Sequence, residues 1–590
     1  MGITGWINHT LDLRQHRGTL CTVAAALGGA HPGTHAVQLS RHAAFASGGL
    51  DTGYAGWHCP HRPEPDLSVI IDGHLDNRGR LEQRLYRRRH PLRSDAEVIL
   101  HAYREWGAGI VEFLEGAYAI AIWDNHTRQL LLIRDRLGLR TLFHTAQAQG
   151  VLFATRATAL LAHPDVTATV DADGLNELIT MCPVRSPGRP ILRGIHELAP
   201  GHLVRVTADG IHTHRYWALH ATPHEQDLDT TVTHLRAAIE NAARPIPAHR
   251  PLSVLLSGGP ASATAAALTA ARHNTAAFTL TLAGPGRLSL RGGADAGTAA
   301  LTAIRLGMNH TVATIGTDEL IAARDTVRSA LDFPCHSATD TTLHALLNRA
   351  REHAQTVVSG EGATAILGGY PWQHDVQTPP VEDFPWRHRT VAPLDLLNAD
   401  AHTHLVPGAY RKERYDAATT NISSVDGESL NQLRLRRSMH IAITHHLPHL
   451  LTRMHRLSEA AGLTPRMPFA DPHLAQFAWN IPLHLRQAIE TPNGLLRHTV
   501  ADLLPREMAW QRSLAFPSAH LLPPWQASQR AHLHDIITDT ASPVNTLLDL
   551  RRTRLLIERP VTQQSREWHA TVDYLIELNT WLETHRVALV

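Results

Sequence analysis

One stretch near the middle of the chain, residues 251–271, limits the possible folds more than any other. An apolar run at 252–256 is followed by Ser257-Gly258-Gly259, and an alanine-rich segment with high helix propensity begins near Pro260. This pattern predicts a β-strand, a glycine turn and a helix N-terminus. The glycines let the backbone approach an anion closely, and the first helix amides point toward that position. We therefore expect a turn that suits pyrophosphate.

Length and composition exclude several classes of protein. A chain of 590 residues needs two or more hydrophobic cores. The net charge of +1 at pH 7 provides no field that would hold nucleic acid or an anionic membrane. The longest apolar runs, such as 117–123, fall short of the ~20 residues that a membrane span needs. The four cysteines show no CxxC spacing and the start shows no signal peptide, so we expect a cytoplasmic protein.

Several segments of the first third form a recognisable set. The chain opens with GITGWI, followed by VIIDGHLDNRGRL at 69–81, RSDAEVILHAY at 93–103 and RDRLG at 134–138. Together they resemble the class II glutamine amidotransferases. The resemblance implies an αββα domain of the Ntn-hydrolase type over residues 1–217, followed by a linker at 218–230.

The positions that carry chemistry in that family differ here. The family has a nucleophilic Cys after the initiator Met, where this chain has Gly2. The family Asn of the oxyanion hole is replaced by Asp72, before Gly73, and a carboxylate would repel a developing oxyanion. Asp95 matches the aspartate that holds the glutamine amine, or alternatively caps a helix. Thr4 would serve as a nucleophile only after trimming, so we expect no glutaminase activity.

The rest of the chain carries a second set of motifs. VVSGEGATAILGGYPW lies at 357–372, a long segment containing RMPFAD lies at 451–482, and LLPREMAWQRSLAFPSAH lies at 503–520. With the loop at 257–262, they resemble the ATP pyrophosphatase domain of the asparagine synthetases. The resemblance implies a doubly wound parallel sheet within residues 231–590, with a strand at 276–282. It extends to near residue 525, beyond which the sequence predicts packing helices at 547–557 and 568–582.

The acidic and basic positions of this domain also differ from the family. In the family, one Asp from each of two loops holds Mg²⁺ on pyrophosphate; Ala261 and Thr364 stand at those positions. Ser513 replaces a Lys that stabilises charge on the acyl-adenylate. Glu361 matches a catalytic glutamate or tyrosine of the family, and is also explained as a structural carboxylate. The remaining residues of the two degenerate loops are Ser257, Gly258, Gly259 and Ser262 in the first and Gly360 and Gly362 in the second.

Three hypotheses follow from the resemblance. The first is a repurposed or pseudo-synthetase of natural-product biosynthesis, which binds a small-molecule or peptide substrate or an active paralogue without metal or cofactor. The second is an amide-forming cyclase similar to the β-lactam synthetases and lasso-peptide cyclases, which would need ATP and Mg²⁺. The third is an ATP-independent enzyme that uses Glu361. A homodimer is the expected assembly if the chain self-associates.

Overall fold

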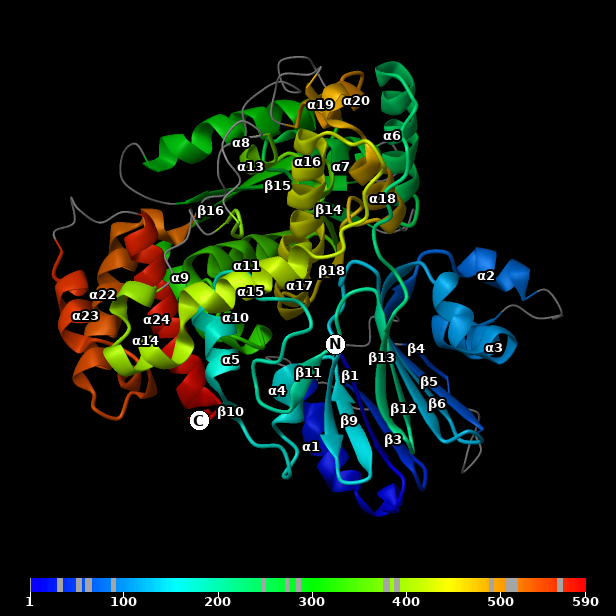
Figure 1. Ribbon diagram of the computed structural model, residues 1–590. Helices are drawn as coiled ribbons and strands as arrows, with labels where there is room; N and C mark the ends of the chain where they lie inside the picture. The colour runs from blue at the N-terminus through cyan, green and yellow to red at the C-terminus, as the bar shows by residue number, and fades with distance from the viewer. Residues whose placement is uncertain are drawn as a thin grey trace. The chain divides into compact units, whose positions relative to one another are not determined.

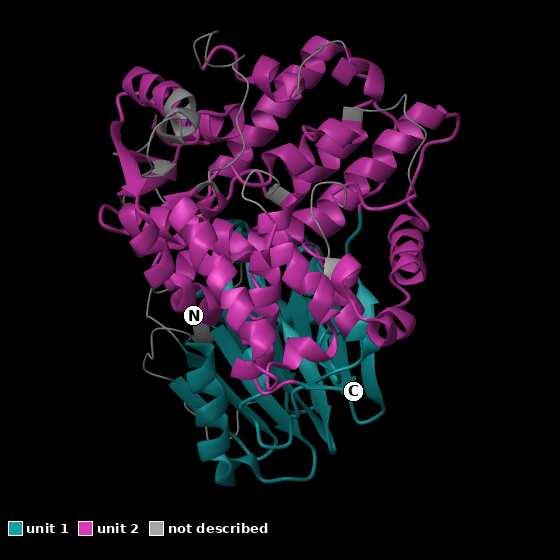
Figure 2. Ribbon diagram, turned by 90° about the vertical axis from the view of Figure 1, so that its left-hand side faces the viewer, with its two compact units in different colours: residues 1–174, 187–218, 588–590 teal, residues 175–186, 219–587 magenta. Residues whose placement is uncertain are grey.

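The computed structural model describes residues 2–28, 36–48, 56–58, 66–85, 92–246, 251–270, 275–282, 288–374, 382–386, 393–487, 493–503, 518–559 and 566–590. The chain divides into two compact units (Figures 1 and 2). Unit 1 comprises residues 1–174, 187–218 and 588–590, and unit 2 comprises residues 175–186 and 219–587. The segment 175–186 therefore groups with unit 2, although it precedes residue 217.

Unit 1 contains two six-stranded sheets in which every strand pair is antiparallel. The first sheet has the order β11 (Ile195–Glu197), β8 (Phe143–Gln147), β9 (Gly150–Ala154), β1 (Gly2–Asn8), β3 (Ala43–Gly48) and β2 (Ala36–Leu39). The second has the order β13 (Gly210–Arg215), β12 (His202–Thr207), β7 (Gln129–Arg134), β6 (Gly116–Asp124), β5 (Leu67–Leu75) and β4 (Gly56–His58). The short strands β10 (Thr169–Val170) and β19 (Ala588–Leu589) pair separately, and in parallel.

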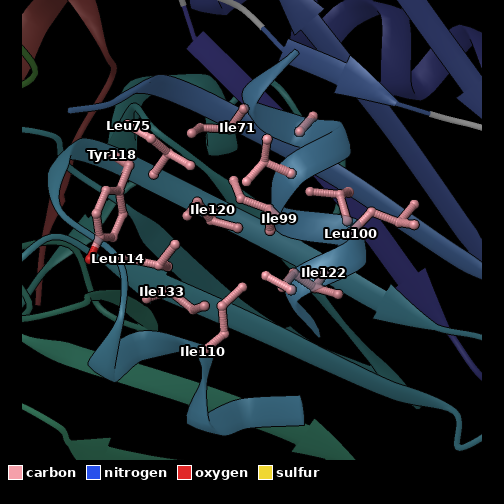
Figure 3. Close-up of a cluster of buried hydrophobic side chains, with 14 of the residues drawn as sticks. Ile71, Leu75, Ile99, Leu100, Ile110, Leu114, Tyr118, Ile120, Ile122 and Ile133 are labelled. Carbon is pink, nitrogen blue, oxygen red and sulfur yellow. The ribbon is translucent and has the colours of Figure 1, made fainter. Parts of the chain in front are cut away.

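Strand β6 contributes side chains to two cores, one on each face of its sheet, as expected for a middle layer of a four-layer unit. Both of its faces are buried, which accounts for its nearly continuous apolar sequence. Alternate residues belong to different cores, because side chains of a strand point to opposite faces. One core, shown in Figure 3, lies between the second sheet and α3 (Asp95–Trp106), and includes Tyr118, Ile120 and Ile122. The other joins side chains of the two sheets and includes Ala119, Ala121 and Trp123.

Helices cover the outer faces of both sheets. Helix α1 (Arg17–Leu27) packs on β1 and β3, and α3 packs on β5. Unit 1 is thus an αββα sandwich, and this part of the predicted fold class is confirmed. Its other described helical segments include η1 (Leu13–Gln15), α2 (Arg78–Arg84), η2 (Gly107–Glu112) and α4 (Ala157–Leu160).

Unit 2 is built on a five-stranded sheet in which all strands are parallel. The order is β16 (Asn309–Ile315), β15 (Thr275–Leu282), β14 (Leu252–Leu255), β17 (Thr356–Val358) and β18 (Thr464–Arg466). The chain starts in the centre at β14, moves outward to β16 and then returns to the other side of β14. This is a doubly wound sheet, so the second part of the predicted fold class is confirmed, including the strand expected at 276–282.

Helices surround this sheet (Figure 1). Helix α7 (Pro260–Ala270) begins where the sequence predicted, and α11 (Ser337–Arg351) packs on β14 and β17. The predicted C-terminal helices are confirmed as α23 (Leu550–Ile557) and α24 (Arg566–Thr584). The other helices include α6 (Leu228–Ala243), α8 (Leu288–Arg305), α9 (Thr317–Ala322), α10 (Arg324–Ala330), α12 (Ala363–Ile366), α13 (Pro371–His374), α14 (Ala399–Leu405), α15 (Pro407–Thr419), α16 (Leu430–Ile441), η6 (Ala442–His446), α17 (Leu447–Ala460), α18 (Pro472–Asn480), α19 (Leu483–Gln487), α20 (Gly494–Thr499) and α22 (Pro523–Thr538).

Two further observations concern the predicted linker and the membrane. Helix α6 begins at Leu228 with Asp227 as its N-cap, so the last three residues of the segment 218–230 are helical. Within the described ranges, no helix combines the length and the hydropathy that a membrane span requires.

Candidate functional site

The predicted loops of unit 2 lie at the carboxyl ends of β14 and β17. These strands are neighbours, and the strand order reverses between them. Ligands of open α/β sheets bind at such a switch point. Residues 257–262 follow β14 and residues 359–362 follow β17, and we call these two loops the switch-point site. The loops touch, because a Cβ built at Gly360 would stand 2.7 Å from the carbonyl carbon of Ala261 and 2.7 Å from the amide nitrogen of Ser262.

The first loop has the geometry of an anion-binding turn. Gly258 has a φ of +79°, a conformation that favours glycine. The Ser262 hydroxyl accepts a hydrogen bond from the Ser257 amide at 3.1 Å and donates one to the Gly259 carbonyl at 3.0 Å. The amides of Gly258, Gly259 and Ala261 have no acceptor among the residues that the structure describes. Backbone donors that end a strand and start a helix in this way favour an anion.

Glu361 provides the one carboxylate of the switch-point site. It is half-buried, and its amide donates to the Ser359 hydroxyl at 3.2 Å. Burial raises the pKa of Glu361, and the Arg453 guanidinium lowers it in part. Arg453 also forms an ion pair with Asp340 and donates to the Thr339 carbonyl at 3.0 Å. Two carboxylates therefore act on one guanidinium.

The residues at the family's metal positions do not fit a carboxylate-bound Mg²⁺. Ala261 lies in the first turn of α7, and Thr364 lies in α12. Neither side chain carries an anionic oxygen, which Mg²⁺ prefers. Across the described parts of the chain, no three or more His, Cys, Asp or Glu side chains are grouped to hold a metal ion.

A set of aromatic side chains beside the switch-point site was missed by the sequence analysis. Tyr370 lies two residues after Gly368, whose φ is +73°. Its hydroxyl shares a hydrogen bond with Nδ1 of His446 at 3.0 Å, and its ring stacks on Trp372 with centroids 4.1 Å apart. The Trp386 ring stacks on the His446 imidazole, with the ring centroids 5.3 Å apart. We call these four residues the aromatic cluster; only the sequence GGYPW hinted at it, because Trp386 and His446 are distant in the chain.

A π-helical turn positions His446. This turn, η6, joins α16 to α17 and packs against α12. A Cβ built at Gly362 would lie 3.4 Å from the side chain of Leu447, directly after the turn. π-Helical turns are rare and often occur at functional sites. Burial lowers the pKa of His446 to about 4, so its imidazole is neutral at pH 7.

The remaining motif positions of unit 2 have structural roles or lie outside the described residues. Ser513 falls in the part of the chain that the structure does not describe. Met454 and His455 are buried in α17, and Nε2 of His455 lies 3.3 Å from Glu459. Asp471 caps α18 by accepting a hydrogen bond from an amide of its first turn.

The predicted glutaminase position in unit 1 is closely packed. A Cβ built at Gly2 would stand 2.6 Å from Oγ1 of Thr155 and 3.2 Å from the side chain of Leu27. Thr4 is buried within β1, and its hydroxyl donates to the Phe153 carbonyl at 2.7 Å. The interpretation of Thr4 as a nucleophile does not fit this position, because its hydroxyl is already engaged within the strand and trimming to it would remove Gly2 and Ile3, which pair with β3.

Asp72 and Gly73 lie side by side in β5. Oδ1 of Asp72 is 3.7 Å from Nε of Arg140, and both side chains are buried. Gly73 has a φ of +124°, and a Cβ there would meet the Ala117 carbonyl oxygen at 1.9 Å. Glycine is therefore required at 73. The ion pair gives Asp72 a structural partner.

Asp95 is not the cap of its helix. The N-cap of α3 is Ser94, whose hydroxyl accepts from the amide of Glu97. The capping alternative for Asp95 is therefore wrong. Instead, the Asp95 carboxylate accepts a hydrogen bond from the Leu75 amide at 2.8 Å and lies 3.6 Å from the Arg78 guanidinium. The N-cap position favours a residue with a side-chain hydroxyl such as Ser94, and this preference would have identified the cap from the sequence.

Two family profiles match the chain. The profile described as asparagine synthase matches residues 234–583, and the profile described as glutamine amidotransferase domain matches residues 50–217. The first match extends to residue 583, so the expectation that the resemblance ends near residue 525 is wrong. The C-terminal helices lie largely within the matched region.

Individual proteins match as well. Asparagine synthetase [glutamine-hydrolyzing] 3 of Bacillus subtilis is 28% identical over 620 residues, covering 99% of this chain and 99% of that protein. A putative asparagine synthetase [glutamine-hydrolyzing] of Mycobacterium bovis is 27% identical and covers 80% of each chain. Among solved structures, glutamine phosphoribosylpyrophosphate amidotransferase from B. subtilis is 14% identical, with a TM-score of 0.27, over 62% of this chain and 82% of that one.

Proposed function

Because this chain belongs to the asparagine synthase family, we propose that it is a repurposed synthetase that binds a biosynthetic substrate without glutamine hydrolysis or Mg²⁺-dependent adenylation. The ligand class is a small molecule or a peptide, or else a segment of an active paralogue. The observation that carries the proposal is the combination of a formed switch-point site with Ala261 and Thr364 at the family's metal positions.

Electrostatics supports the loss of adenylation. Phosphoryl oxygens that crowd together in the transition state need cations, and the absence of such stabilisation costs several kcal/mol, roughly 2.7–4 per group. Pro260 also removes one backbone donor from the turn. The exchange of two carboxylates for Ala261 and Thr364 makes this region less charged, which favours a less polar ligand.

Unit 1 supports the loss of glutamine hydrolysis. Gly2 offers no nucleophilic side chain, and Thr155 stands where a side chain at position 2 would begin. Asp72 places a carboxylate at the expected oxyanion position. Unit 1 then remains as a folded unit without that activity.

A second candidate function is favoured by the three amides of the first loop. Because no described residue accepts a hydrogen bond from the amides of Gly258, Gly259 and Ala261, the turn still suits pyrophosphate, as an ATP-dependent amide-forming cyclase would need. In that case a metal would be held by water and phosphate oxygens, or by residues outside the described ranges.

ATP–pyrophosphate exchange separates the two functions. We expect no exchange above background with amino-acid or peptide acids, with or without Mg²⁺, and no thermal shift with ATP. The asparagine synthetase of B. subtilis named above serves as the positive control for the assay. Robust Mg²⁺-dependent exchange by the unmodified protein would refute the repurposed synthetase and support the cyclase.

A further inference from the structure

The segment 175–186 of unit 2 is held by hydrogen bonds to two helices of that unit. The Tyr574 hydroxyl of α24 donates to the Leu178 carbonyl at 2.6 Å. The Tyr410 hydroxyl of α15 donates to the Glu177 carboxylate at 2.8 Å. Leu178 and Glu177 are both buried, so an acceptor left without its donor would cost free energy. The segment therefore has a defined position.

Arg185, near the end of this segment, is a cation without a counter-charge. The amide of the next residue, Ser186, donates to Glu177 at 2.7 Å and fixes the backbone here. The guanidinium carbon of Arg185 lies 4.5 Å from the ring centroid of the buried Phe333. Among the residues that the structure describes, no acceptor takes a hydrogen bond from Arg185 and no carboxylate pairs with it. The donors of this half-buried guanidinium are therefore available to a ligand.

Two half-buried histidines belong to the same group of side chains. His336 lies three residues after Phe333, and its ring stacks on Tyr574, which holds the segment, with ring centroids 5.8 Å apart. His449 of α17 meets the His336 ring edge-on, with centroids 6.3 Å apart. Contacts through Phe333 and Tyr574 thus join the two imidazoles to the segment that carries Arg185.

The polar atoms of both imidazoles are open to a ligand. Within the described ranges, neither ring has a hydrogen-bond partner, and the ring nitrogens are not sealed from solvent. Burial lowers the pKa of His336 and lowers that of His449 well below its ordinary value, and the Arg185 charge acts in the same direction on both. Both imidazoles are therefore neutral at pH 7, and each carries one N–H donor.

The acidic side chains of this region are engaged elsewhere. Asp340 forms an ion pair with Arg453. Asp573 accepts from the Ala338 amide at 2.8 Å and lies 3.2 Å from Nε2 of His520. Further carboxylates are Asp332 and Glu577, which pair with Arg456 and Arg328, and Glu361, which forms no ion pair with Arg185. A half-buried guanidinium whose neighbouring carboxylates are engaged elsewhere favours an anion from outside the chain.

We propose that Arg185, His336 and His449 form a binding site for an oxyanion, the carboxylate or phosphate group of a small molecule. The planar fork of a guanidinium matches two oxygens of such a group, and each imidazole adds one donor. The site goes beyond the proposed function, because none of its residues belongs to the switch-point site. No bond is made or broken in it.

Calorimetry on the full-length protein at pH 7 tests the site. The probes are inorganic phosphate, acetate and acetamide, which is the neutral isostere of acetate. We expect both oxyanions to bind and acetamide to bind at least about tenfold more weakly than acetate, as the loss of a charge-assisted contact implies. The tighter of the two oxyanions then identifies the group. Equal binding of acetamide and acetate, or no binding of either oxyanion, would overturn the proposal.

Matched variants locate the binding. R185Q removes the charge and should weaken oxyanion binding about tenfold or more, and H336N and H449N about threefold to tenfold each. R349Q, at a half-exposed arginine paired with Glu319, and H353N, at an exposed histidine, should leave it unchanged. Undiminished binding to a folded R185Q would place the anion elsewhere, such as the turn at Gly258, and refute the site.

A conservative variant keeps the test informative if R185Q fails to fold. R185K retains the charge and loses the planar fork, so we expect a loss of about threefold to tenfold in oxyanion affinity. Full affinity in R185K would overturn recognition by the guanidinium. ATP–pyrophosphate exchange is measured on the same samples. Exchange together with intact oxyanion binding refutes the repurposed synthetase alone, and absent binding without exchange refutes the oxyanion site alone.

Discussion

At the residue scale, Thr155 makes the change at position 2 difficult to reverse. We expect G2C to show no glutamine hydrolysis, because the new Cβ would stand 2.6 Å from Oγ1 of Thr155 and Asp72 would still oppose an oxyanion. The crowding should also lower the free energy of unfolding by about 1–3 kcal/mol. Glutamate release above the wild-type background, measured by a coupled assay, would contradict this expectation.

Gly360 is the residue on which the contact of the two loops depends. In G360A, the new Cβ would stand 2.7 Å from backbone atoms of Ala261 and Ser262, and backbone cannot yield as a flexible side chain does. We expect a loss of about 1–3 kcal/mol in the free energy of unfolding, measured with urea.

A second glycine provides the control for this variant. Gly408 lies in α15 with open space around its Cα, so G408A should keep or raise stability, by up to about 1 kcal/mol. If both substitutions had the same effect, the contact between the loops would not be what constrains position 360.

At the scale of the element, α24 is held by buried charges on its inner face. Both carboxylate oxygens of Glu577 accept from Arg328 of α10 at 2.8 Å, and the Cys335 thiol donates to Glu577 at 3.3 Å. Asp573, one turn earlier, accepts from the Ala338 amide at 2.8 Å. Removing one partner of a buried ion pair leaves the other charge uncompensated.

We therefore expect E577A to lower the free energy of unfolding of unit 2 by about 3–5 kcal/mol and to expose α24 to hydrogen exchange. The half-exposed pair of Arg349 and Glu319 is the comparison, because E319A should cost no more than about 1 kcal/mol. A cost of under 1 kcal/mol for both variants would show that apolar packing, and not the ion pair, holds the helix.

At the scale of the whole molecule, partly buried neutral histidines predict acid sensitivity. Burial lowers the pKa of His445 to about 3 and of His446 to about 4, and it lowers the pKa of His449 well below its ordinary value. The unfolded chain binds these protons near pH 6.5, whereas the folded chain does not. Stability is therefore full above pH 6.5 and falls as the pH drops toward 4, by about 2 kcal/mol per histidine at pH 5.

Urea unfolding at pH 7, 6 and 5 measures this loss. H446Q removes one titrating group, so its stability should decline less steeply between pH 7 and 5 than that of the wild type. Parallel declines for the two proteins would mean that His446 does not contribute. The comparison uses slopes, so a constant loss from the hydrogen bond to Tyr370 does not affect it.

The sequence by itself determined the position of the turn after β14, and its motifs implied both sheet architectures through their resemblance to known families. The turn and the strands could be predicted because the nearly continuous apolar run of β6 and the apolar run before Ser257-Gly258-Gly259 are local properties of the sequence. The same locality explains the error at Asp95, where the competing cap, Ser94, is one residue away. The structure brings Gly360 and Ala261 together, but the roles assigned to the predicted site residues remain predictions.

Only the tertiary structure decided what surrounds these residues. His446 reaches Tyr370, and Trp386 reaches His446, through loop and helix packing across many residues, and no sequence spacing encodes that approach. The sharing of Arg453 between Asp340 and Glu361 likewise depends on three separate elements. Strand periodicity and glycine turns act within a few residues, whereas the charge balance of a site depends on which distant side chains meet when the core forms.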